Sequence, residues 1–94
     1  MALTPIQLNH QIEKAIRVHL TKMRAAVKGE QTLALYLLIE KQFPTETVTT
    51  GLFNRILGDM RRAGIIEEVF GKQDVWYLSD GAWELHQKGA GVQS

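Results

Sequence analysis

The sequence predicts a small, mainly helical α+β domain that carries a single β-hairpin near its end. The chain has 94 residues, of which 45% are apolar, and this length suits one domain with one core. Apolar residues recur at steps of three and four in several segments, which is the helical period. Close to the end, two short apolar runs flank Gly71, which is typical of a hairpin. We therefore treat residues 1–94 as a single domain.

The first helix is predicted from Pro5 to about Gly29, with proline in its first turn after Thr4. Its inward face comprises Leu8, Ile12, Ala15, Ile16, Leu20, Met23 and Val27. This face is longer than one small domain needs for its core. The segment 1–29 is thus a candidate dimerisation helix, with a second copy of the chain packed on Leu8, Ile12, Ile16 and Leu20.

A second helix is predicted from Glu30 to Phe43, and Pro44 ends it. Its central stretch, LALYLLI, is apolar nearly all round, so we expect this helix to be buried between its neighbours. A buried strand is the competing interpretation of such a run. The charged and polar residues on both sides favour the helix.

The third helix is predicted to start in TETVTT, with Thr47 or Thr49 as its N-cap, and to end near Ala63. Its inward face comprises Phe53, Ile56, Leu57 and Met60. Gly64 follows as a C-terminal cap.

Two strands, IIEEVF and DVWYL, are predicted around a turn at Gly71 and Lys72. Ser79 is placed to cap a last short helix, DGAWELHQK. We expect the tail at 89–94 to be frayed.

Composition excludes several classes of protein. There is no run of 18 or more apolar residues to span a membrane, and the start of the chain lacks the pattern of a secretory signal. The absence of cysteine removes disulfides and thiolate metal sites, which fits a cytoplasmic protein. The net charge is only +1, but the front of the chain is basic and the back is acidic.

Neither a metal site nor catalysis is expected, and we predict no cofactor. The three histidines, His10, His19 and His86, do not pair at ligand spacing. Glu67 and Glu68 are neighbours on a predicted strand, so they point to opposite faces and cannot act as an acid/base pair. We therefore predict that the protein is not an enzyme.

The order of three helices, a hairpin and a closing helix is that of a winged helix-turn-helix. Two motifs strengthen this interpretation, MRRAGII at 60–66 and WYLSDG at 76–81. They resemble the end of the recognition helix and the end of the wing in bacterial regulators of the MarR, ArsR and PadR type. The resemblance covers about residues 30–88. By the same pattern, Trp76 and Leu78 face the core and Tyr77 faces outward.

The resemblance implies a DNA-binding transcriptional regulator whose third helix reads the major groove of double-stranded DNA. Asparagine and arginine can pair with base edges, while threonine and arginine hold phosphates. The expected DNA-binding residues are Thr49, Thr50, Asn54, Arg55, Arg61, Arg62 and Lys72. Families of this type are commonly dimers, so a homodimer is expected.

An alternative function comes from the charges of the wing, which holds Glu67, Glu68 and Asp74 but only one cation, Lys72. An acidic wing favours a protein-interaction module that binds a protein partner through the wing or the first helix. The cations of the first helix, Lys14, Arg17, Arg24 and Lys28, are interpreted as a solvated charged face.

Overall fold

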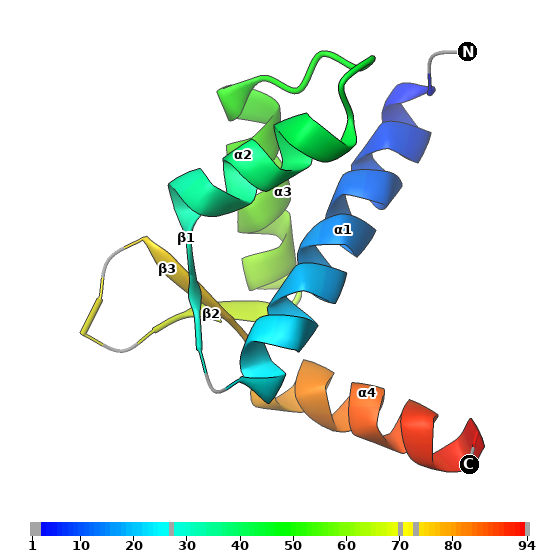
Figure 1. Cartoon of the computed structure of the whole chain (residues 1–94), viewed down its shortest axis with the longest axis vertical. Helices are drawn as coiled ribbons and strands as arrows, with labels where there is room; N and C mark the ends of the chain where they lie inside the picture. Colours follow the sequence, from blue (N-terminus) through cyan, green and yellow to red (C-terminus); the bar gives the residue numbers. More distant parts are fainter. Residues whose placement is uncertain (1–2, 27, 70, 73, 94) are drawn as a thin grey trace.

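A computed structural model describes residues 3–26, 28–69, 71–72 and 74–93. Within this part of the chain, four helices and a small three-stranded antiparallel sheet form a compact α+β domain (Figure 1). The elements are α1 (Pro5–Ala25), β1 (Glu30–Gln31), α2 (Thr32–Gln42), α3 (Thr50–Arg62), β2 (Ile66–Glu68), β3 (Val75–Leu78) and α4 (Asp80–Gln93).

Helix α1 begins as predicted. The Thr4 hydroxyl accepts a hydrogen bond from the Gln7 amide, and the Gln7 side chain accepts one from the Thr4 amide, which is a complete capping box. The helix ends at Ala25, four residues before the predicted glycine, and Val27 lies outside the described residues.

The apolar face of α1 forms the centre of the core. The residues proposed for contact with a second copy are all buried within one chain: Leu8, Ile12, Ile16 and Leu20. They pack against residues of α2, α3 and the sheet. This face is therefore not available for dimerisation, because the chain itself covers it.

The prediction for the second helix is wrong at its start. Glu30 and Gln31 form a short strand instead, and α2 begins at Thr32. Strand β1 pairs with β3, opposite Trp76 and Val75, so a distant partner overrides the local helical pattern. The Glu30 carboxylate also lies 2.8 Å from His19 Nε2, which ties β1 to α1.

Helix α2 is not buried on all sides, although its composition predicted that it would be. Leu35 and Ile39 are in the core, but Leu33 is 66% exposed and Leu37 is 53% exposed. These two leucines are four residues apart, so they lie on one exposed face of the helix. An apolar run does not show which of its faces the neighbouring elements cover.

The sheet has the order β1-β3-β2, so β3 is its central strand rather than one half of an isolated hairpin. Gly29 allows the chain to come close to β3 before β1. A β-carbon at this position would lie 2.8 Å from Val75 Cγ1 and 2.9 Å from the Trp76 carbonyl oxygen. Trp76 Nε1 donates to Thr32 Oγ1 at 2.8 Å, which joins β3 to the start of α2.

Helix α3 agrees with its predicted inward face and cap. Thr49 is the N-cap, and its hydroxyl accepts a hydrogen bond from the Leu52 amide at 3.1 Å. Phe53, Ile56, Leu57 and Met60 are all buried. Gly64 has a φ of 76°, the left-handed conformation that lets the chain leave the helix and enter β2.

The hairpin is confirmed in its two strands and its turn, where Gly71 has a φ of 79°. Phe70 lies outside the described residues. Trp76 and Leu78 face the core, and Tyr77 faces outward, as predicted.

Ser79 caps α4 as predicted and also closes the preceding turn. Its hydroxyl accepts from the Ala82 amide and donates to the Gly64 carbonyl at 2.5 Å. The helix continues to Gln93, through most of the segment that we expected to be frayed. None of the helices in the described residues is long and apolar enough to cross a membrane.

Candidate nucleic-acid interface

The outward face of α3 is the first candidate site. With the four inward side chains buried, the helix exposes Thr50, Gly51, Asn54, Arg55, Asp59, Arg61 and Arg62. A β-carbon at Gly51 would meet only the Thr49 hydroxyl, at 3.9 Å, and one at Gly58 would meet only the guanidinium of Arg62. These two glycines place no side chain on the outer surface of the helix, and the guanidinium of Arg62 lies over Gly58.

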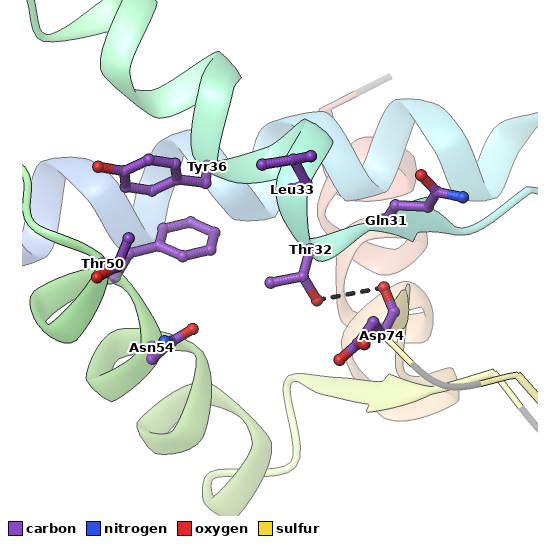
Figure 2. Close-up of a pocket in the computed structure, with 8 residues that line it drawn as sticks. Gln31, Thr32, Leu33, Tyr36, Thr50, Asn54 and Asp74 are labelled. Atoms are coloured by element: carbon purple, nitrogen blue, oxygen red, sulfur yellow. Dashed lines mark hydrogen bonds between the residues drawn. The ribbon is translucent and has the colours of Figure 1, made fainter.

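Two of the predicted residues line a cleft beside α3. Thr50 and Asn54 share it with the start of α2 and the end of the hairpin loop (Figure 2). The cleft has a volume of ≈ 630 Å³ and is lined by Gln31, Thr32, Leu33, Tyr36, Thr50, Phe53, Asn54 and Asp74. The Thr32 hydroxyl donates to the Asp74 carbonyl at 3.2 Å, which closes one side of it. Asp74 is held at a φ of 59°, uncommon for a residue with a side chain.

One wall of the cleft is aromatic. The rings of Tyr36 and Phe53 meet edge to face, with centroids 5.4 Å apart. The Tyr36 hydroxyl donates to the Val48 carbonyl at 3.0 Å. Burial, and next the charge of Glu40, raise the pKa of Tyr36 above its usual value of 10.0, so the phenol is neutral at physiological pH.

The two arginines at the end of α3 each contact a carboxylate. Arg61 lies 3.0 Å from Glu68 of β2, and Arg62 pairs with Asp59 one turn earlier on its own helix. All four side chains are substantially exposed, and such pairs contribute about 0–1 kcal/mol. Arg55 is exposed and forms no ion pair with any residue that the structure describes.

Lys72 does not join the arginines of α3. It lines a separate hollow on the sheet, together with Lys28 and both glutamates of β2. Thr49 is engaged in capping, since its hydroxyl oxygen accepts from the helix. The structure therefore brings Thr50 and Asn54 together, places Arg55, Arg61 and Arg62 along the outer face, and leaves Lys72 elsewhere.

Sequence reasoning missed the acids that face these arginines. Asp59 precedes Arg62 by three residues on one helix, and this spacing was a usable signal for a pair. Glu68 was predicted to be on the hairpin, but only the fold shows that it reaches Arg61. The structure also differs at Arg24, which was interpreted as solvated but binds the Leu78 carbonyl and Asp80.

The described residues contain no cluster of side chains suited to a metal ion. There, histidine, aspartate and glutamate side chains do not gather in groups of three or more that could hold a metal ion. In addition, each buried polar side-chain atom in this part of the chain has a hydrogen-bond partner. The chain matches no family model, and no curated protein or solved structure matches it significantly.

Proposed function

We propose that this chain is a winged helix-turn-helix protein that binds double-stranded DNA through α3 and regulates transcription. The observation that carries the proposal is the outer face of α3. Gly51 adds no side chain to this face, which carries an exposed asparagine and three exposed arginines. Of the three arginines, Arg61 alone contacts a carboxylate of another element among the described residues. Such a face can approach a groove closely and offers donors to both phosphates and bases.

Each residue has an expected role in this proposal. Asn54 and Arg55 lie in the middle of the helix, where they would meet base edges, while Thr50 meets a phosphate near the N-terminus. Arg61 and Arg62 hold the backbone at the other end. Their carboxylate partners do not prevent this, because an exposed ion pair is weak enough for a phosphate to displace.

The wing contributes little to DNA binding in this proposal. Glu68 stands beside Arg61, and Lys72 lies in the hollow on the sheet with Glu67 and Glu68. Carboxylates near a phosphate backbone oppose binding. We therefore assign recognition to α3 alone, with a net affinity that is modest and strongly dependent on salt.

The proposal is tested by fluorescence anisotropy with a random-sequence duplex, at salt concentrations from about 50 to 200 mM. We expect binding that weakens steeply with salt. Arg62→Ala should lower the salt slope by about 0.9, because it removes one phosphate contact. Arg55→Ala should instead reduce the discrimination between duplexes of different defined sequence, because Arg55 is assigned to base edges.

Lys14→Ala is the matched control, because it removes one exposed cation from α1 and leaves α3 unchanged. Loss of binding that is equal in all three variants would show that net charge, and not α3, is responsible. An absence of binding at the lowest salt would overturn the proposal.

A second candidate function is a protein-interaction module, and the cleft of Figure 2 favours it. Exposed Leu33 and Leu37 lie on the helix that lines this cleft, and Asp74 adds a negative charge at its edge. This function predicts partner proteins that are captured by the natural chain and lost with the Leu33→Glu, Leu37→Glu double variant. Capture that the double variant leaves unchanged would exclude this face.

A further inference from the structure

We propose that the cleft of Figure 2 makes this protein select A·T base pairs, with Asn54 paired to an adenine and Leu33 packed on the 5-methyl group of a nearby thymine. This selection rests on the proposed function, because it requires a duplex on α3. It goes beyond that function by naming the bases that the cleft end of the helix reads.

Asn54 presents an unused amide to the cleft. The residue lies one turn after Thr50 on α3 and is exposed, and its side chain forms no hydrogen bond with any residue that the structure describes. An amide offers a hydrogen-bond donor and an acceptor side by side. In the major groove, the matching pair on a single base is the N6 amino group and N7 of adenine.

Leu33 adds an exposed apolar surface to the same cleft. It is the second residue of α2 and is 66% exposed, and the rings of Tyr36 and Phe53 extend the apolar lining. The 5-methyl group of thymine is the apolar group that bases present in the major groove. Contact between this methyl group and Leu33 removes apolar surface of both from water, which favours binding.

The charge of the cleft also suits a base edge. Asp74 is the one charged residue that lines the cleft, so a phosphate meets a carboxylate there and no lysine or arginine. The uncharged edge of a base pair therefore fits better than the sugar-phosphate backbone. Because Asn54 and Leu33 line one cleft, their two bases belong to the same pair or to neighbouring pairs. The predicted preference is a short run of A·T pairs.

Base analogues in the preferred duplex test the two contacts separately. The duplex is selected from a random-sequence library with the full chain, and affinities are then measured by fluorescence anisotropy. Deoxyuridine in place of thymidine removes the 5-methyl group alone, and at one position it should lower affinity about three- to four-fold. 7-Deazaadenine in place of adenine removes the N7 acceptor alone, and at one position it should lower affinity about five-fold or more.

Two variants connect each analogue to its side chain. In Leu33→Ala, the deoxyuridine duplex should bind as tightly as its parent duplex, and in Asn54→Ala the 7-deazaadenine duplex should do so. Leu37→Ala is the matched control, because this leucine is also exposed on α2 but is not among the residues that line the cleft. It should keep the full response to both analogues. Circular dichroism establishes that each variant is folded.

The possible outcomes separate this selection from DNA binding itself. A chain that binds duplexes equally whatever their sequence overturns the A·T selection and leaves DNA binding in place. So does a response to the analogues that is the same in all three variants, or a preferred duplex with G·C pairs at the positions that Leu33→Ala and Asn54→Ala affect. A chain that binds no duplex at the lowest salt overturns both proposals.

Discussion

An arginine at the junction of α1, β3 and α4 has different surroundings from an arginine at the edge between α3 and β2. At the junction, the side chain of Arg24 is 15% exposed, and it donates at 2.6 Å to both the Leu78 carbonyl and Asp80. Its guanidinium also lies 4.3 Å from the ring centre of Tyr77. At the edge, the side chain of Arg61 is 60% exposed, and Glu68 is its only ion-pair partner among the described residues. One arginine connects three elements, and the other is held by one weak pair.

This difference shows how a residue type acquires its role from its surroundings. A hydrogen bond to a charged group that is shielded from water contributes about 1.5–3 kcal/mol, whereas an exposed ion pair contributes about 0–1 kcal/mol. Arg24 therefore contributes to the stability of the fold. The ion pair of Arg61 with Glu68 is weak, so the guanidinium can leave Glu68 and bind a ligand.

The largest expected effect is that of Arg24→Ala. The substitution removes the hydrogen bond to the partly buried Leu78 carbonyl, the pair with the exposed Asp80 and the contact with the Tyr77 ring. The free energy of unfolding should fall by about 2–4 kcal/mol, most of it from the bond to Leu78. Urea unfolding followed by circular dichroism measures it. Arg61→Ala is the control and should change stability by about 0.5 kcal/mol or less. Equal losses in the two variants would contradict the distinction between the two regions.

A smaller effect is expected at the hydroxyl that joins the end of α3 to the start of α4. Ser79→Ala removes the cap of α4 and leaves the Gly64 carbonyl without its donor, which should cost about 1–2 kcal/mol. Thermal unfolding measures the loss. Thr47→Ala, at an exposed threonine, is the control. A Ser79 variant as stable as the control would show that neither bond matters to the fold.

The smallest expected effect is that of Glu68→Gln, at the edge between α3 and β2. Glu68→Gln removes the partner of Arg61 and one negative charge beside α3, so affinity for a duplex should rise by about three- to ten-fold at low salt. Stability should change by about 0.5 kcal/mol or less.

Glu67→Gln is its control, because Glu67 is the neighbouring exposed acid on β2 and forms no ion pair within the described residues. Anisotropy titrations compare the two variants. An equal gain in both would assign the effect to net charge and not to the release of Arg61.

Local patterns were sufficient for most of α1, for α3 and for the hairpin, but not for the start and the exposed face of α2. The periodicity of α1 and α3 identified their buried residues, and Thr4, Thr49, Gly64 and Ser79 end or begin elements where the sequence indicates. The strand β1 was not predictable. It has two residues, and the partner that makes it a strand is 44 to 46 positions away in the chain.

The candidate site was predictable only as a set of exposed side chains. The helical period assigned Thr50, Asn54, Arg55, Arg61 and Arg62 to the outside of α3, which is where the structure has them. The period carries no information on contacts between distant segments. For that reason, the pairing of Arg61 with Glu68 and the separation of Lys72 from the arginines emerged only with the fold.

The central position of β3 has a consequence for the synthesis of this chain on the ribosome. Two of its residues, Trp76 and Leu78, are part of the core, and this strand is the one to which β1 and β2 both pair. When the first 70 or so residues have emerged, three helices are available, but the sheet lacks its central strand and α1 lacks its contacts with β3. The native core thus cannot close before β3 has been synthesised, and a nascent chain that stops before Leu78 should depend on chaperones and be degraded quickly by proteases.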